Sequence, residues 1–256
     1  MNASFGALPR NTPTAAPTNN ARRSERRFFS GMAIALLLTV FAGFAPTYYL
    51  RGTFGSPPLT PSLWVHGFAF SAWMVLLVIQ TSLIAANRID IHRRLGVGGG
   101  ALAVLMMVLG AYVAISRTAS GEVLSPPGVS PLAFLTVSLA AIIVFPVLLG
   151  SAMGFRKRPD IHKRLVLIAT LELVMAAVGR LPGIFNPLGP IALGVAGLFV
   201  VTDLFLVPIA VYDWRSRGRL HPATLWGGAF FIISQPLRGM LGTTAAWTSF
   251  AAWLTS

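Results

Sequence analysis

The sequence contains no cysteine. This absence excludes disulfide bonds, thiolate metal sites and catalysis by a cysteine thiol. Charged residues are also scarce, because they make up only 11% of the 256 residues, against roughly 25% in soluble globular domains. With 55% hydrophobic residues and a mean hydropathy of +0.72, the composition excludes an ordinary soluble domain and predicts a multi-pass membrane protein.

Acidic residues and lysines are the rarest charged groups. The chain has seven acidic residues against 20 basic ones, which gives a net charge of +13. Only Lys157 and Lys163 are lysines, and this bias toward arginine favours a bacterial, GC-rich genome. In a soluble protein such a charge suggests a nucleic-acid partner. Here the basic residues border apolar runs, where they set membrane topology, so we expect a lipid bilayer and no nucleic acid as the partner.

The apolar residues form seven runs of about the 20 residues that a bilayer requires. The expected fold is all-α, a polytopic bundle of about seven transmembrane helices. Residues 1–27 are expected to form a disordered, basic N-terminal tail, and residues 28–241 the seven-span domain. Residues 242–256 are too short to span and carry Trp247 and Trp253, which predicts a short interfacial segment. The seven runs lie at about residues 28–50, 63–86, 95–116, 131–154, 163–183, 189–212 and 223–241.

The basic residues lie mainly on one side of the predicted spans. One set of loops holds fifteen of them, and the other side holds only Arg51, Arg117, Arg180 and Arg238. Basic loops face the cytoplasm, so the sequence predicts an inner-membrane protein with a cytoplasmic N-terminus and a periplasmic C-terminus. The fifteen residues are Arg22, Arg23, Arg26, Arg27, Arg88, Arg93, Arg94, Arg156, Lys157, Arg158, Lys163, Arg164, Arg215, Arg217 and Arg219.

A charged segment between apolar runs occurs twice, at residues 88–95 and 158–165. The two copies read RIDIHRRL and RPDIHKRL, so six of eight positions are identical. Each copy follows one apolar run and precedes another, which is typical of the elbow of a helical hairpin. A third elbow, residues 213–222, keeps the Asp, the arginines and the His without their spacing. The pattern therefore predicts a bundle built largely from repeated helical hairpins.

The elbows supply one group of candidate site residues. Asp90 and Asp160 precede apolar helices, where a short acceptor side chain can cap free backbone amides. Three elbow histidines, His92, His162 and His221, lie at the predicted cytoplasmic face. If the hairpins bring them together, imidazoles and a carboxylate can hold a divalent metal, and His92 with His162 can hold a haem. A membrane-bound redox or metal-dependent enzyme is therefore one alternative, although no metal site or cofactor is assigned.

Two carboxylic acids within the apolar runs are a second group. A charge at mid-bilayer costs roughly 2.5–3.5 kcal/mol on insertion scales. Glu172 lies nine residues after Lys163, and Asp203 lies nine residues before Tyr212, so each is about 13 Å from the cytoplasmic end of its helix. Two carboxyls at one depth on neighbouring antiparallel helices can face each other, in which case they share a proton.

Other polar residues complete the expected pocket. Arg180 and Arg238 fall in the outer third of their spans, and His66 falls near the outer end of its own. Gln80 and Gln235 add neutral polar groups. Together with the two carboxylic acids, these side chains are expected to line an intramembrane pocket for a small anionic or protonatable solute.

The segment 63–183 resembles uncharacterised bacterial polytopic membrane proteins, including a predicted-membrane-protein family of unknown function. The likeness is carried by Gln80, by the elbow His-Arg-Arg-Leu-Gly at residues 92–96, and by a later helix that runs from His162 to Arg180. The resemblance implies a bacterial inner-membrane protein and supplies no activity. Solute binding or transport is therefore the first hypothesis, the redox or metalloenzyme is the second, and a structural subunit of a membrane complex is the third.

Overall fold

A computed structural model describes residues 19–123, 125–182 and 194–256 of the chain. The regular structure in these ranges is helical, which confirms the all-α class. The elements are α1 (Asn19–Phe44), the π-helical η1 (Ala45–Tyr49), α2 (Pro61–Ala85), α3 (Ile89–Ala119), α4 (Pro131–Gly154), α5 (Pro159–Val178), α6 (Gly194–Asp203), α7 (Leu206–Arg217), α8 (Pro222–Gly242) and α9 (Ala245–Leu254).

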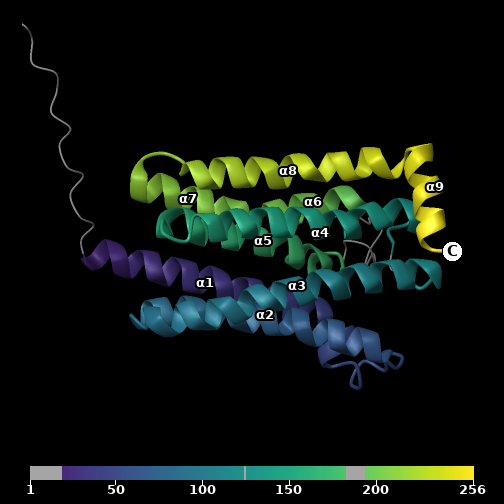
Figure 1. Ribbon diagram of the computed structural model, residues 1–256, viewed down its shortest axis with the longest axis horizontal. Coiled ribbons are helices and arrows are strands. Elements are labelled where there is room, and N and C mark those ends of the chain that lie inside the picture. Colours follow the sequence, from purple (N-terminus) through teal and green to yellow (C-terminus); the bar gives the residue numbers. More distant parts are fainter. Residues whose placement is uncertain (1–18, 124, 183–193) are drawn as a thin grey trace, which may run out of the picture.

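The helices α1 to α8 run along the length of one bundle, and α9 turns across its far end (Figure 1). The start of α1 and the α2–α3, α4–α5 and α7–α8 connections gather at the opposite end (Figure 1), which we call the basic end. The indole N–H of Trp247 in α9 donates a hydrogen bond of 2.8 Å to the carbonyl of Leu132 in the first turn of α4. The aromatic C-terminal segment is thus attached to the bundle at the far end.

Two local expectations are corrected by the helix starts. Helix α1 begins at Asn19, so residues 19–27, expected to be part of a disordered tail, are helical; their Arg, Glu and Ala residues favour helix. Residues 1–18 lie outside the described part of the chain. Asp90 and Asp160 do not cap α3 and α5, because the N-cap positions are Arg88 and Arg158. Both aspartates lie in the first turn, where a negative charge interacts favourably with the helix dipole.

Helix α5 is the centre of the bundle. It packs against α1, α4, α6 and α8, and 13 of its 20 residues are buried, against four of 25 in α2. A helix that is buried on all faces needs apolar side chains around its whole circumference. The charged residues Arg164 and Glu172 are exceptions, since both are buried inside α5, and they require partners from the surrounding helices.

The outer surface of the bundle is apolar. Val97 is 78% exposed and Phe68 is 71% exposed, and large exposed apolar surfaces of this kind are typical of contact with lipid or a partner. Five segments are long and apolar enough to cross a membrane: residues 19–49, 61–85, 89–119, 131–154 and 195–217. This pattern is that of a multi-pass membrane protein. Helices α5 and α8 are not among the five, and they are the two helices that carry Glu172 and Arg238.

A glycine allows α1 to reach the backbone of α5. A Cβ atom added at Gly43 would lie 2.3 Å from the carbonyl oxygen of Ala177 and 2.8 Å from its carbonyl carbon. Small residues at such positions let helix backbones approach closely in membrane bundles. Gly43 therefore determines how closely α1 packs against the central helix.

We expect the substitution Gly43→Ala to destabilise the protein by about 1–3 kcal/mol, because a backbone contact can be relieved only by shifting a helix. Gly31→Ala is the matched control on the same helix, since an added Cβ there meets nothing within 4 Å and alanine gains helix propensity of about 1 kcal/mol. Thermal unfolding of the purified variants measures both effects. A Gly43→Ala protein as stable as Gly31→Ala would show that α1 is not packed this closely.

Candidate functional site

The largest departure from an apolar core is an ion pair between α5 and α8. Arg238 donates two parallel hydrogen bonds to the Glu172 carboxylate, of 2.6 Å to Oε1 and 2.8 Å to Oε2. The two side chains are only 1–2% exposed. Arg238 also donates to the Ser234 hydroxyl at 2.7 Å, while its Nε is buried without a hydrogen-bond partner in the described chain. A planar guanidinium that binds a carboxylate through two bonds gives strength and fixed geometry.

Asp203 lies beside this pair and takes its partner from the same helix. The amide of Gln235 donates a hydrogen bond of 2.7 Å to Asp203 Oδ1. Gln235 and Arg238 are three residues apart, so they lie on one face of α8. The expectation that Glu172 and Asp203 face each other and share a proton is therefore wrong: each carboxyl group faces a different polar side chain of α8. We call Glu172, Arg238, Ser234, Asp203 and Gln235 the α8 polar cluster.

Two local irregularities lie beside the α8 polar cluster: a two-residue turn between α6 and α7, and a proline inside α8. Helix α6 ends at Asp203 and α7 begins at Leu206, so a two-residue turn lies next to the half-buried carboxyl group within one continuous apolar segment, residues 195–217. Pro236 lies inside α8, between Gln235 and Arg238, and proline removes a backbone hydrogen bond from a helix interior. The backbone hydrogen bonding is therefore irregular next to Asp203 and next to Arg238.

A second polar network lies at the basic end, centred on Asp213 of α7. Arg164 of α5 donates its Nε to Asp213 Oδ1 at 2.9 Å, and Oδ2 accepts from the Thr224 hydroxyl at 2.5 Å and from the His221 backbone N–H at 3.1 Å. Asp213 is fully buried and Arg164 is 2% exposed. The carboxylate thus joins α5 to the α7–α8 connection.

The tautomer of His221 follows from its partners. Its Nδ1 accepts the Ala223 backbone N–H at 3.0 Å, which caps α8. Nε2 therefore carries the proton and donates to Asp160 Oδ2 at 3.1 Å. Burial lowers the pKa of His221 below its usual range, and nearby Arg164 and Arg217 lower it further, while Asp160 acts in the opposite direction.

The other two elbow histidines meet each other and not His221. The rings of His92 and His162 are perpendicular, with centroids 6.4 Å apart. His162 Nδ1 lies 2.8 Å from the carbonyl oxygen of Ala152, so it carries the proton and leaves Nε2 free. Nδ1 of His92 and Oε1 of Gln80 are buried without hydrogen-bond partners in the described residues. The three elbow histidines are thus not one metal site, and no group of three or more His, Cys, Asp or Glu residues gathers within the described ranges.

His66 and Arg180 lie outside the α8 polar cluster. His66 packs its ring against Phe70 at 4.3 Å between centroids, and Arg180 lies 4.4 Å from the centroid of Phe44. Of the residues expected to line one pocket, Glu172, Arg238, Asp203 and Gln235 come together. Arg180, His66 and Gln80 do not join them.

Sequence reasoning missed the residues that complete both networks. Ser234, Arg164 and Thr224 were not assigned roles, and Asp213 was noted only as part of the third elbow. Arg164 lies within the second basic elbow, residues 158–165, so it is indistinguishable in sequence from the neighbouring topology-determining residues. One feature of the sequence could have identified these residues. The chain has only seven side-chain carboxylates, and each of them needs a polar or charged partner if it is buried.

Comparisons of the chain with protein-family models, with curated protein sequences and with solved structures found no match. The sequence patterns and the geometry above are therefore the basis for any functional inference.

Acidification is expected to destabilise the protein partly through His221. Because the folded-state pKa lies below the unfolded value of about 6.5, the unfolded chain binds more protons as the pH falls below that value, and stability decreases. His221→Asn keeps a capping acceptor for the Ala223 N–H but cannot titrate. The fall in melting temperature between pH 7.5 and 5.0 should be smaller in this variant than in the wild type. An equal fall in melting temperature in both proteins would show that His221 does not contribute to the loss of stability in acid.

Proposed function

We propose that this protein is a seven-span bacterial inner-membrane protein that binds a small carboxylate anion together with a proton at the Glu172–Arg238 pair and carries them across the membrane. The observation that supports this most is the fully buried pair between α5 and the proline-containing helix α8, beside the turn that separates α6 from α7.

Seven spans follow if α5 and α8 are added to the five apolar segments. Both helices run beside α4 along the bundle (Figure 1), and their polar residues are turned inward, which removes the cost of exposing charge to lipid. The basic end then faces the cytoplasm by the excess of arginine. The first hairpin α2–α3 and the second hairpin α4–α5 are interpreted as copies of one unit, since the meeting of His92 and His162 is compatible with equivalent positions.

The proposed mechanism is an exchange of carboxylates on Arg238. Removing one partner from a buried ion pair costs about 3–5 kcal/mol, because a charge is left unpaired. If Glu172 takes up a proton, Arg238 loses its counter-ion unless another anion replaces it. A solute carboxylate that binds the guanidinium therefore favours protonation of Glu172, and protonation of Glu172 favours binding of the solute. Anion and proton are coupled without any change in the net charge of the site.

The turn between α6 and α7 and Pro236 inside α8 provide a way to open the site. Asp203 is half-buried and accepts a hydrogen bond from Gln235, three residues before Arg238 on α8. Movement of α8 about Pro236 changes the position of Arg238 relative to α5, because Arg238 follows the proline by two residues. Hinge residues at the ends of helical segments absorb such changes.

We expect small monocarboxylates, tested as a panel of formate, acetate, propionate and lactate, to raise the melting temperature of the purified protein, and more so at pH 6 than at pH 8. With one proton taken up per anion, the apparent affinity should increase up to about tenfold for each unit that the pH falls. Glu172→Gln should lower stability in the absence of anion and should make anion binding independent of pH. Arg238→Gln should abolish binding.

The matched control is Arg117→Gln, which removes a cation whose partner Glu122 is exposed. This variant should bind the carboxylates as the wild type does. If Glu172→Gln and Arg238→Gln only reduce stability, and no carboxylate stabilises the wild type at either pH, the pair is a structural connection. The protein is then better explained as a structural subunit of a membrane complex.

Reporter fusions test the proposed orientation. Fusions after Asn87, Phe155 and Ser216 should report the cytoplasm, and fusions near Ser120 and at the C-terminus should report the periplasm, because the basic connections remain inside. A cytoplasmic C-terminus would contradict the count of seven spans and would place α8 or α5 outside the bilayer.

A second candidate function is favoured by the His92–His162 contact. The ring separation of 6.4 Å is compatible with one metal held by a nitrogen of each ring at about 2 Å, and the bond from His162 Nδ1 to a carbonyl is the usual support of a metal-binding imidazole. Absorption spectra and metal analysis of the purified protein decide this candidate. A haem Soret band or stoichiometric metal that is lost in His162→Ala would support a redox or metal-dependent enzyme. The absence of both signals from the purified wild type would exclude this candidate.

A further inference from the structure

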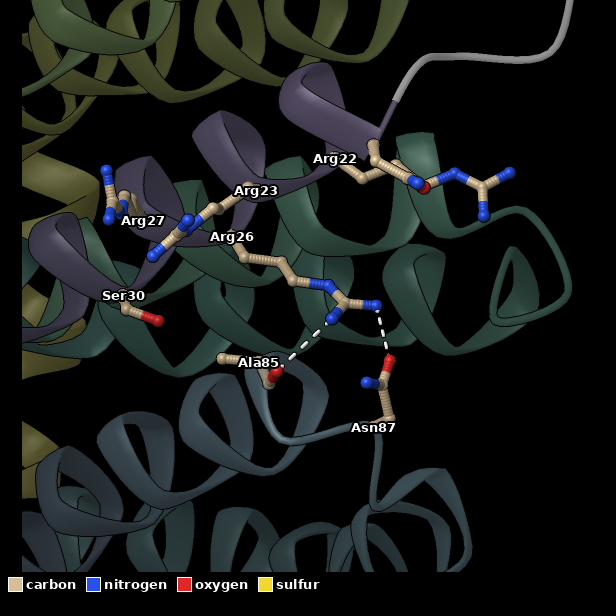
Figure 2. Close-up of a pocket in the computed structure, with 8 residues that line it drawn as sticks. Arg22, Arg23, Arg26, Arg27, Ser30, Ala85 and Asn87 are labelled. Atoms are coloured by element: carbon tan, nitrogen blue, oxygen red, sulfur yellow. Dashed lines mark hydrogen bonds between the residues drawn. The ribbon is translucent and has the colours of Figure 1, made fainter.

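A basic hollow lies at the start of α1, at the basic end of the bundle. It has a volume of about 760 Å³ and is lined by Asn19, Arg22, Arg23, Arg26, Arg27, Ser30, Ala85 and Asn87. Figure 2 shows Arg26 crossing from α1 to the α2–α3 connection, where it donates to the Ala85 carbonyl at 3.2 Å and to Asn87 Oδ1 at 2.7 Å. We call this hollow the arginine cradle.

The shape of the arginine cradle follows from helix periodicity and one turn. Arg23, Arg26 and Ser30 are three and four residues apart, so they lie on one face of α1. Asn87 has a φ of 60°, a left-handed conformation that asparagine tolerates better than most residues. This turn places the Asn87 side chain where Arg26 binds it, which fixes one wall of the hollow.

The positive charge of the arginine cradle is not balanced by the protein. All seven side-chain carboxylates of the chain lie in the described residues. Each of them has a polar partner that is not an arginine of the cradle. The pairs are Glu25–Lys163, Asp90–Arg88, Glu122–Arg117, Asp160–His221, Glu172–Arg238, Asp203–Gln235 and Asp213–Arg164. Arg22, Arg23 and Arg27 are exposed, and Glu25 on the same helix pairs with Lys163, so these three arginines remain available to an anion that is not part of this chain.

A polar atom inside the hollow also lacks a partner. The hydroxyl oxygen of Ser30 is buried and makes no hydrogen bond within the described chain. A buried hydroxyl without a partner costs free energy that a bound acceptor can recover. Arginine side chains and a hydroxyl donor together are the groups that bind phosphate oxygens.

The helix below the hollow identifies the source of the phosphate. Ile34 and Phe41 follow Arg27 at intervals of seven residues, so the three lie on one face of α1. Ile34 is 45% exposed, Leu38 is 60% exposed and Phe41 is 44% exposed. A basic group followed along one helix face by exposed apolar side chains matches a molecule with an anionic headgroup and an acyl chain.

We propose that the arginine cradle binds the phosphate of an anionic lipid headgroup, with the acyl chain lying along Ile34, Leu38 and Phe41. The site is separate from the Glu172–Arg238 pair and does not depend on the transport proposal. Arg26 holds α1 to the α2–α3 connection, and Arg22, Arg23 and Arg27 remain available to the headgroup. The bound lipid thus supports the attachment of α1 to the α2–α3 connection at the basic end.

The test titrates full-length protein in detergent with phosphatidylglycerol, and in parallel with phosphatidylcholine, inorganic phosphate and glycerol 3-phosphate, followed by native mass spectrometry and melting temperature. The wild type should bind phosphatidylglycerol and be stabilised by it, in preference to phosphatidylcholine. Arg23→Gln/Arg27→Gln should weaken this binding by roughly tenfold or more, since each basic residue near a membrane surface contributes to anionic-lipid affinity. This double variant leaves the Arg26 contacts intact, so the fold is preserved.

The matched control is Arg93→Gln/Arg94→Gln, which removes two charges from the same end of the bundle outside the cradle. It should retain phosphatidylglycerol binding. Equal losses in both double variants would reduce the effect to general charge attraction and would overturn the site. Unchanged binding in Arg23→Gln/Arg27→Gln would also overturn it. Binding of inorganic phosphate or glycerol 3-phosphate as tight as that of the lipid would support a phosphate site and overturn the lipid as its source.

Discussion

The ion pair between Glu172 and Arg238 is the interaction on which the arrangement of the bundle depends. Both side chains are buried in the centre of an apolar assembly, and either charge without the other would cost several kcal/mol. Helix α8 must therefore lie against α5 in one register. The same register brings Gln235 to Asp203, and at the basic end Asp213 connects Arg164 with the start of α8. Polar contacts fix the position of α8, whereas α1 depends on the close approach at Gly43.

Helices α5 and α8 are not among the five segments with the composition of a simple membrane span, and both carry buried charged residues, Arg164 and Glu172 in α5 and Arg238 in α8. Their charges cancel inside the bundle, and the surface that remains toward lipid is apolar. At the start of α1 the charges are not balanced in this way. Within the described part of the chain, the arginines at the start of α1 make no ion pair with a carboxylate, which is why we propose that this end binds an anionic headgroup.

The sequence was sufficient to predict the helical class and the bounds of α2, α4 and α8 to within two residues, because hydropathy and proline positions determine both. It also identified Glu172, Asp203, Arg238 and Gln235, because polar residues in apolar runs are conspicuous. The sequence could not show which of these residues contact each other. Their depths along the helices allow Glu172 to meet either Asp203 or Arg238, and the choice depends on the rotation of α8 about its axis. The helical start at Asn19 was missed, because polar helix-forming residues such as those at 19–27 are not distinguished from a tail by hydropathy. The expected outer ends of the fifth span and the start of the sixth fall on residues 183–193, outside the described part of the chain.

The central claim is that an anion replaces Glu172 on Arg238 only when Glu172 takes up a proton. The most direct measurement is proton uptake from a weakly buffered solution, followed with a pH indicator, when acetate or lactate is added to purified protein near neutral pH. The exchange of carboxylates predicts an uptake of about one proton per bound anion in the wild type, and none in Glu172→Gln although the anion still binds. Anion binding without proton uptake in the wild type, or the same uptake in Glu172→Gln, would contradict it.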